Sequence, residues 1–224
     1  MKRFPLIGAV FAAASMCLMP QAIAQQSDDN PEYKPPSRGA LAGRVGGGTR
    51  GLHPLPLAAL SPDHTGLTVS AQPALYYFAP VSAGVRLALR PVSDPSSQPL
   101  VEKELSPPRG AGIQRLELKS LGVTLTPGVE YRWTVSMAGE TREATGTIQR
   151  IEPTAELSRK LSATSGRSRY AMLAREGLWY DAFDEVSRAV EAAPNNPVPA
   201  RHRAALLEQI GLSAIARYER QRYE

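Results

Sequence analysis

The residues best suited to chemistry form two short clusters in the first third of the chain. In the first cluster Asp63, His64 and Thr65 are consecutive. A carboxylate beside an imidazole can take part in proton transfer or ligand binding. Pro62 and Gly66 flank the cluster and predict a turn at the surface. Because loops often carry function, the pattern leaves two interpretations open, a structural turn and a catalytic or ligand-binding loop.

The second cluster is rich in glycine and has an arginine near each end; its residues are Arg44, Val45, Gly46, Gly47, Gly48, Thr49, Arg50 and Gly51. The glycine spacing matches a dinucleotide-binding loop, but such a loop must open a helix. Pro54 and Pro56 follow too closely for a helix, which disfavours a nucleotide site. Either the glycines allow close packing, or the backbone N–H groups and the two arginines hold a carboxylate or phosphate.

Other signatures of catalysis or metal binding are missing from the sequence. The three histidines, His53, His64 and His202, do not pair at helical spacing, and no zinc-protease, EF-hand or serine-hydrolase motif occurs. Acidic residues that could act together are scattered, as are Asp94, Glu102 and Glu104. We therefore expect no catalytic residues, no metal and no cofactor, although a catalytic triad assembled from distant positions would leave no local motif.

The first 24 residues have the pattern of an export signal. Lys2 and Arg3 precede the apolar run Phe4–Met19, and Ala22–Ala24 is a small-x-small cleavage site. We expect cleavage after residue 24, which places the protein in the periplasm or outside the cell without a membrane span. An uncleaved anchor is disfavoured because the run contains Pro5 and is shorter than the roughly 20 residues that a span needs.

Composition limits the classes of partner and chemistry. The formal net charge is +5, and loss of the leader removes two of the positive charges. No block of five or more Lys and Arg residues occurs, so nucleic-acid binding is not expected. The single cysteine, Cys17, lies within the leader, so the mature chain has neither disulfides nor cysteine-ligated zinc.

Residues 25–51 read as an extended lead-in rich in proline and glycine, and residues 52–151 as a β-sandwich. Apolar and polar residues alternate over Val129–Met137 after a Pro-Gly turn, which predicts a half-buried strand with Trp133 facing the core. Six further runs have strand character, which gives seven strands, or eight with a split of the second run at Pro73. The runs are Leu55–Leu60, Leu67–Ser70 continuing as Ala74–Phe78, Val85–Val92, Leu100–Leu105, Ile113–Leu118 and Ala144–Ile151. Their even spacing predicts antiparallel pairing.

Residues 152–224 have a helical pattern. Thr154 can cap Ala155–Leu161, a second helix covers Ser168–Glu176, and a later one covers Pro197–Ile210. Between them, Gly177–Asn196 resembles the second half of a tetratricopeptide repeat. One repeat cannot bury its own core, so these helices must pack on the sandwich or on a partner helix. The tail from Arg217 to Glu224 is expected to be solvated.

Aromatic residues mark where that packing occurs. Trp179 and Tyr180 stand at a helix start, and Tyr76, Tyr77 and Phe78 are consecutive in a strand. Neighbours in a strand face opposite sides, so one set must point away from the sandwich core. Either these residues fill the joint between sandwich and helices, or Trp179 and Tyr180 contact a partner.

Several blocks resemble an exported bacterial family known as domain of unknown function nine-two-eight. They are Tyr33–Pro36, Arg44–Gly51, Leu60–Thr68, Ala71–Pro73, Pro127–Trp133 and Gly177–Ala182. The resemblance implies an envelope protein, suspected of assisting membrane sensor proteins, with no established reaction. Pro127–Trp133 also resembles a late strand of an immunoglobulin or fibronectin type III domain. The expected fold is thus a mainly β protein, an immunoglobulin/fibronectin-III-like antiparallel sandwich followed by a short tetratricopeptide-like helical segment.

Two functions fit these observations. The first is a non-enzymatic module that binds an envelope protein or peptide. The second is a glycan-binding protein or hydrolase that uses the loop with Asp63 and His64. A glycan site is expected to gather these residues with Arg44 and Arg50 around one pocket, whereas a partner-binding module is expected to expose an apolar patch.

Overall fold

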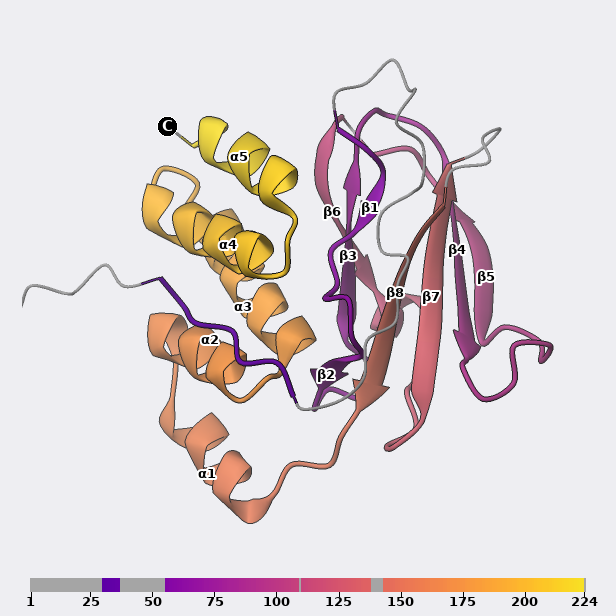
Figure 1. Ribbon diagram of the computed structural model, residues 1–224, viewed down its shortest axis with the longest axis horizontal. Coiled ribbons are helices and arrows are strands. Elements are labelled where there is room, and N and C mark those ends of the chain that lie inside the picture. The colour runs from indigo at the N-terminus through magenta and orange to yellow at the C-terminus, as the bar shows by residue number, and fades with distance from the viewer. Residues whose placement is uncertain (1–29, 37–54, 109, 138–142, 224) are drawn as a thin grey trace, which may run out of the picture.

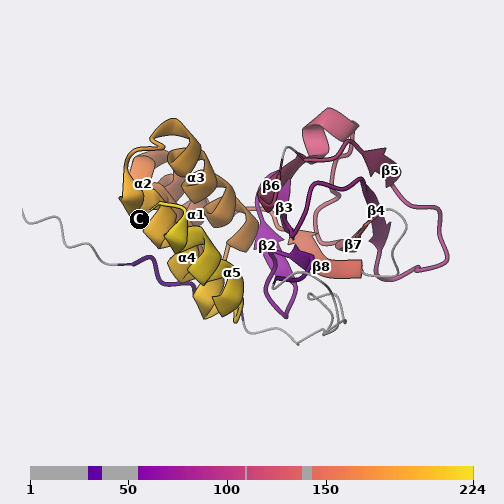
Figure 2. The same cartoon turned by 90° about the horizontal axis from the view of Figure 1, so that it is seen from above.

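The computed structural model describes residues 30–36, 55–108, 110–137 and 143–223. Within these ranges eight strands come first and five α-helices follow, so the protein is mainly β with C-terminal helices. The helices lie against a three-stranded sheet, which in turn faces a five-stranded sheet (Figures 1 and 2). The expected export signal and the arginine-flanked glycine loop, Arg44–Arg50, lie outside the described residues.

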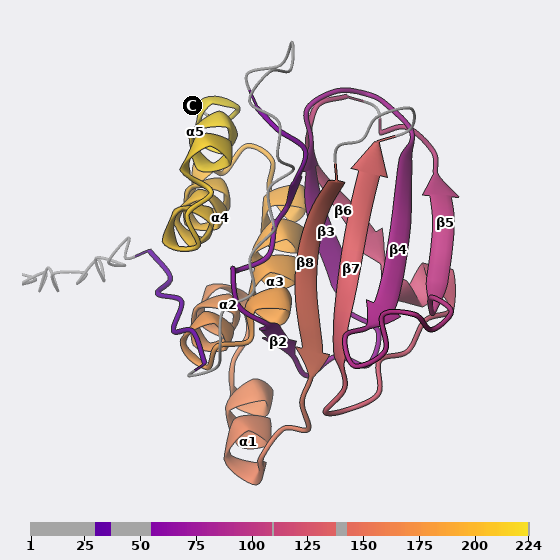
Figure 3. The same cartoon turned by 45° about the vertical axis from the view of Figure 1, so that its right-hand side comes forward.

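The three-stranded sheet has the order β1-β3-β6, and the five-stranded sheet has the order β2-β8-β7-β4-β5 (Figure 3). The strands fall where the sequence predicts them, and Pro73 separates β2 from β3. Their bounds are β1 Ala58–Ala59, β2 Gly66–Thr68, β3 Ala74–Ala79, β4 Val85–Pro91, β5 Val101–Leu105, β6 Gly112–Glu117, β7 Glu130–Met137 and β8 Glu143–Arg150.

The expectation of purely antiparallel pairing is wrong at one edge. β2 pairs with β8 in parallel, with Gly66 opposite Ile148 and Thr68 opposite Arg150. Parallel neighbours require a long connection, and the whole of β3 to β7 lies between these two strands. The alternating pattern of a short strand does not encode the direction of its neighbour. The parallel pair therefore has no signature in the sequence.

β7 supplies the centre of the sandwich core, as its alternation predicts. Trp133 is completely buried, and the residue opposite it on β8 is Gly146. A Cβ atom on Gly146 would lie 2.6 Å from the indole Nε1 of Trp133 and 2.8 Å from Cβ of Ser61. The strand therefore needs glycine here because the Trp133 ring occupies the space of a side chain.

β3 is buried along its whole length because it is covered on both faces. Tyr76 packs edge-to-face on Phe183, and Phe78 packs edge-to-face on Tyr218, each pair with ring centroids 5.1 Å apart. Tyr77, which alternates with them, is 3% exposed on the opposite face of the strand. The aromatic run thus fills the joint between sheet and helices, one of the two interpretations that the sequence left open.

The helices are α1 Ala155–Ala163, α2 Gly166–Arg175, α3 Trp179–Ala192, α4 Pro197–Gln209 and α5 Ser213–Gln221; a short 3-10 helix, Leu118–Leu121, follows β6. The predicted cap of α1 is confirmed, since the hydroxyl of Thr154 accepts a hydrogen bond from the Leu157 N–H at 3.1 Å. Asn196 caps α4 in the same way, ahead of Pro197 at its first position.

The tail from Arg217 to Glu224, expected to be solvated, is so only in part: Arg217, Gln221 and Arg222 are exposed, but the tail begins within the packed helix α5. Ile215 and Ala216 are buried against the rest of the chain. Glu219 is fully buried and forms an ion pair with Arg203 of α4, which is itself 6% exposed. The many charged residues of this tail predicted solvent exposure, but a buried carboxylate is tolerated where a guanidinium lies beside it.

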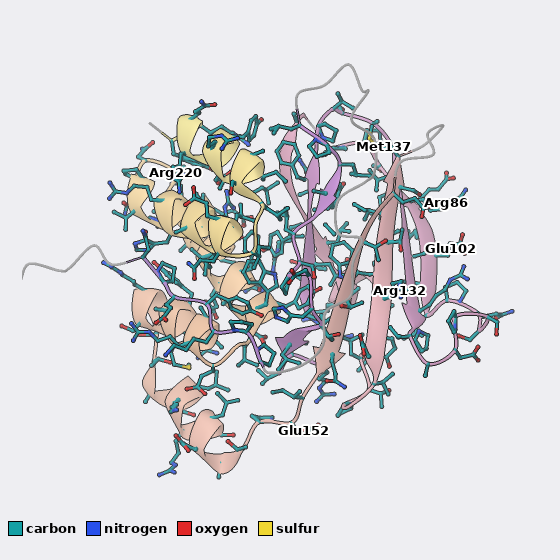
Figure 4. All side chains as sticks on the ribbon, viewed as in Figure 1. Arg86, Glu102, Arg132, Met137, Glu152 and Arg220 are labelled. Atoms are coloured by element: carbon teal, nitrogen blue, oxygen red, sulfur yellow. The ribbon has the colours of Figure 1, made fainter. Side chains whose placement is uncertain are left out.

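The outer face of the five-stranded sheet is polar. Arg86 on β4 forms ion pairs with Glu102 and Glu104 on β5, at 3.7 and 3.1 Å, and Arg132 lies on the neighbouring strand β7 (Figure 4). These residues lie on the side of the sheet away from the helices (Figure 4). No helix in the described part of the chain combines the length and the apolar character needed to cross a membrane.

We predict that Gly146→Ala destabilises the fold by about 1–3 kcal/mol, because the new methyl group overlaps the Trp133 ring. Chemical denaturation followed by tryptophan fluorescence measures this loss. Gly110→Ala is the matched control, since a Cβ atom there meets nothing within 4 Å. Equal unfolding midpoints for the two variants would contradict the packing described for β7 and β8.

Candidate functional site

A polar cleft lies where the helical layer meets the three-stranded sheet. Its volume is about 300 Å3. It is bounded by the segment joining β2 to β3, by the end of β6, and by α1, α2 and α3; the lining residues are Val69, Ser70, Gln72, Pro73, Ala74, Arg115, Glu117, Lys119, Leu161, Arg169, Leu173, Tyr180, Asp181, Asp184, Glu185 and Arg188. Acidic and basic side chains thus alternate around a single depression.

Asp184 is the most strongly held carboxylate of the cleft. Its Oδ1 accepts hydrogen bonds from the Tyr76 hydroxyl at 2.7 Å and from Arg115 Nε at 3.0 Å. Its Oδ2 lies 2.9 Å from Arg188 Nε, one helical turn further along α3. Burial and the neighbouring Asp184 raise the pKa of Tyr76, which therefore stays a neutral donor. With both oxygens occupied by donors, Asp184 fastens α3 to β3 and β6.

Asp181, one turn before Asp184 on α3, is held differently. Its Oδ1 accepts from the Thr68 hydroxyl at 3.0 Å and its Oδ2 from the Val69 N–H at 2.9 Å. Among the described residues no Lys or Arg forms an ion pair with it. Burial raises the pKa of the Asp181 carboxyl to about 6, although its two hydrogen bonds favour the charged form. Asp181 is thus a carboxylate that changes charge near neutral pH.

A second depression, the groove, lies on the helices alone and has a volume of about 550 Å3. Small apolar side chains form much of its surface, with arginine and glutamate side chains at the rim; the lining residues are Gly166, Arg167, Tyr170, Glu185, Arg188, Ala189, Ala192, Asn196, Val198 and Pro199. Glu185 and Arg188 line both the groove and the cleft. The two depressions are therefore neighbours on one face of α2 and α3.

Most of the charged side chains of the cleft are paired with one another. In the cleft Arg115 and Arg188 are paired with Asp184, and Arg169 donates to Glu185 at 2.9 Å. These ion pairs fix the positions of the charged groups around the cleft. Among the described residues no group of three His, Cys, Asp or Glu side chains is arranged to hold a metal ion. The surface is suited to a ligand that carries both polar and small apolar groups.

The sequence-predicted loop with Asp63 and His64 is separate from both depressions. His64 is 9% exposed, and its Nε2 lies 2.9 Å from the hydroxyl of Tyr33. Its Nδ1 lies 3.4 Å from the carboxylate of Asp63, which is 64% exposed. Burial raises the pKa of Tyr33, so its hydroxyl remains protonated. Neither Asp63 nor His64 lines the cleft or the groove, and the expected companions Arg44, Gly46, Gly47, Gly48, Thr49 and Arg50 lie outside the described residues.

The two aromatic residues expected to meet a partner are buried within this chain. Trp179 and Tyr180 are 0% and 2% exposed. Trp179 Nε1 donates to the carbonyl of Leu60 at 2.9 Å. The Tyr180 hydroxyl accepts from Trp133 Nε1 at 2.8 Å and lies 2.8 Å from the carbonyl oxygen of Thr147. These side chains join α3 to the sandwich; Trp179 is wholly covered, and Tyr180 contributes only a small part of the cleft lining.

Large side chains do not form the apolar patch expected of a partner-binding module: on the described surface Leu100, at 41%, is the one large hydrophobic residue that is exposed. Asp181 and Asp184, the acids of the cleft, are not among the site residues predicted from the sequence, because they stand in a segment explained by its repeat-like apolar spacing. Their i, i+3 separation puts both on one side of α3. That spacing was the available signal for a carboxylate pair.

A protein-family model described as Domain of Unknown Function (DUF928) matches residues 45–219. The matched range runs from before β1 into α5, and so it includes the cleft and the groove. None of the curated proteins compared with the chain matches it.

We predict that Asp181→Asn removes a pH-dependent part of the stability. In the folded protein the carboxyl titrates near 6, above its ordinary value of 3.8, so its contribution is fully present below pH 3.8 and is lost as the pH rises through 6. Relative to the wild type, the variant should gain on the order of 2 kcal/mol between pH 4 and pH 7, at about 1.4 kcal/mol per pKa unit. Urea denaturation at both pH values measures the gain.

Asparagine suits this position because its oxygen can accept from the Val69 N–H while its amide donates to the Thr68 hydroxyl. Glu152→Gln, which neutralises a carboxylate that is 67% exposed, controls for the loss of one negative charge. A stability difference between Asp181→Asn and the wild type that stays constant from pH 4 to pH 7 would contradict a raised pKa.

Proposed function

We infer that this chain, which belongs to the family described as Domain of Unknown Function (DUF928), is an exported, non-enzymatic module that binds an extended segment of an envelope protein. The observation that carries the proposal is the pair of adjoining depressions on α2 and α3, the polar cleft and the apolar-floored groove. An extended peptide presents both polar backbone amides and side chains. Its polar groups can bind the charged cleft, and its apolar side chains can bind the adjoining groove.

Export is part of this proposal and is supported by the leader pattern of residues 1–24. The proposed site of action is the periplasm or the exterior of the cell. A mature chain without cysteine is suited to both places, since its fold does not depend on the redox state of the surroundings. A role as an accessory to a membrane sensor protein would follow if the bound segment belonged to such a protein.

Arg188 is the residue that we expect to contact the partner from both depressions. It lies on the border of the cleft and the groove, and its side chain is 59% exposed although Asp184 holds one of its nitrogens. Guanidinium groups bind carboxylates with two parallel hydrogen bonds. The proposed ligand therefore carries an Asp or Glu side chain next to small apolar residues that lie over Ala189 and Ala192.

The finer aspects of the fold are also proposals. We propose that the two sheets form an immunoglobulin- or fibronectin-III-like sandwich, supported by the buried Trp133 of β7 between them. We also propose that α2 and α3 correspond to one tetratricopeptide-like pair, supported by Gly177 at the turn between them and Pro194 after the second helix. In this description the sandwich takes the place of the repeats that would otherwise flank the pair.

The proposal predicts that blocking the groove abolishes capture of the partner. Ala192 lines the groove and is exposed at the last position of α3, so Ala192→Glu adds a charged side chain without disturbing the core. Immobilised mature protein should recover one envelope polypeptide from a membrane and periplasm extract. The Ala192→Glu variant should recover at least ten-fold less of that polypeptide. Mass spectrometry identifies and quantifies the polypeptide.

Ala163→Glu is the matched control, because Ala163 is also an exposed last residue of its helix, α1, and lines neither depression. Wild-type and Ala163→Glu proteins should recover the same polypeptide in equal amounts. Equal recovery by Ala192→Glu would exclude the groove as the binding surface. Retention on envelope polysaccharide without any recovered protein would instead support the glycan-binding alternative and the loop with Asp63 and His64.

A further inference from the structure

Residues 30–36, which we call the strap, lie across the helical layer although they precede the first strand by more than twenty residues (Figure 1). None of the eight described strands pairs with the strap. Its buried residues alternate with exposed ones: Pro31 and Tyr33 are buried, whereas Glu32 and Lys34 point to solvent. Over residues 31–34 this is the arrangement of an extended peptide held on a receptor, with Pro31 and Tyr33 inserted into it; Pro35 is exposed.

The backbone of the strap is bound by the ends of two helices. The Lys34 N–H donates to the carbonyl of Ala174, near the end of α2, at 3.1 Å. Gln209, at the end of α4, makes a double contact: its Oε1 accepts from the Tyr33 N–H at 2.7 Å, and its Nε2 donates to the Pro31 carbonyl at 2.8 Å. One glutamine side chain thus binds the two peptide groups on either side of Glu32, which fixes the register of the strap.

Tyr33 is the anchor of the strap. Its ring packs edge-to-face on Trp179, with centroids 5.1 Å apart, and stacks on His64 with an interplanar angle of 6°. Its hydroxyl forms the 2.9 Å hydrogen bond with His64 Nε2. The pocket therefore satisfies both the aromatic ring and the polar tip of a tyrosine, and phenylalanine or leucine would leave the imidazole nitrogen without its partner.

Gly177 shapes the surface beneath the strap. A Cβ atom on Gly177 would lie 2.9 Å from the Lys34 carbonyl oxygen and 3.4 Å from Cδ of Pro36. The bare backbone of this glycine lets the strap approach α2 and α3 closely, and the flat ring of Pro36 lies over it. The receptor surface is thus fitted to a tyrosine followed, after two residues, by proline.

The receptor residues are held in place by contacts that do not involve the strap. Trp179 is fixed by its hydrogen bond to the Leu60 carbonyl, and α3 is fixed to β2 and β3 through Asp181 and Asp184. None of the receptor residues named above lines the groove. The receptor surface is therefore formed by the folded body of the protein, and the strap adds to it from outside.

We propose that the strap occupies a second peptide-binding site, and that the site also accepts, from a partner protein, an extended segment with the chemistry Pro-x-Tyr-x-Pro-Pro. The strap is tethered to the site, so it competes with such a segment at a high effective concentration. A partner binds when its segment is presented at comparable concentration or fits more tightly. This site is distinct from the groove, and the inference does not depend on the proposed function.

The test uses a fluorescein-labelled synthetic peptide with the sequence of residues 30–36, Asn-Pro-Glu-Tyr-Lys-Pro-Pro, and the full mature chain. Tyr33→Ala removes the anchor of the strap and so vacates the tyrosine pocket. By fluorescence anisotropy the peptide should bind Tyr33→Ala at least ten-fold more tightly than it binds the wild type. A peptide with alanine in place of tyrosine should not bind Tyr33→Ala. Adding Gln209→Ala to Tyr33→Ala should lower the affinity for the tyrosine peptide about ten-fold.

Wild-type protein provides a second readout that does not require the variant to fold. Excess tyrosine peptide should accelerate hydrogen–deuterium exchange of the Tyr33 and Lys34 amides several-fold as the strap is displaced, whereas the alanine peptide should leave that exchange unchanged. Equal binding of the two peptides, or no binding to Tyr33→Ala together with unchanged exchange in the wild type, would overturn the proposal. The groove variant Ala192→Glu should bind the tyrosine peptide as the wild type does, which separates this test from that of the proposed function.

Discussion

The structure depends on one buried hydrogen-bonded contact, that between the Tyr180 hydroxyl of α3 and the Trp133 indole of β7. Both side chains are almost completely buried, and each carries a polar group that must find a partner away from water. The Tyr180 hydroxyl accepts from Trp133 and lies within hydrogen-bond distance of the Thr147 carbonyl. Helix and sandwich thus satisfy each other's polar atoms, so the two parts share one core.

The cleft follows from the way α3 meets the sheet. One side of the helix carries Trp179, Tyr180 and Phe183, which are buried against the sandwich. Asp181 and Asp184 stand at the edge of that contact, where the aromatic packing ends and donors from the strands become available. The acids accept hydrogen bonds from those donors and line the polar cleft. The same helix therefore both closes the core and forms the wall of the cleft.

The helical layer carries two different surfaces that we propose bind other molecules. The groove opens on α2, α3 and α4 and is bordered by Arg188, whereas the strap site uses the ends of α2 and α4 and the start of α3. One surface is open in the monomer and the other is filled by the protein's own tyrosine. A module with an open and a self-occupied site can hold one partner while its second site stays closed to weaker ligands.

The sequence by itself determined the local elements, because strand alternation, Pro-Gly turns and helix caps act within a few residues. It predicted β7 with Trp133 inside and the cap at Thr154, and it left open the split at Pro73 that the structure shows. Only the tertiary structure decided the parallel edge strand, the burial of α5, and the partners of Asp181, Asp184 and His64. Each of these depends on residues between 16 and 113 positions away in the chain. Local patterns fix which side chains face inward, but which distant donor or ring they meet is set by how the layers pack.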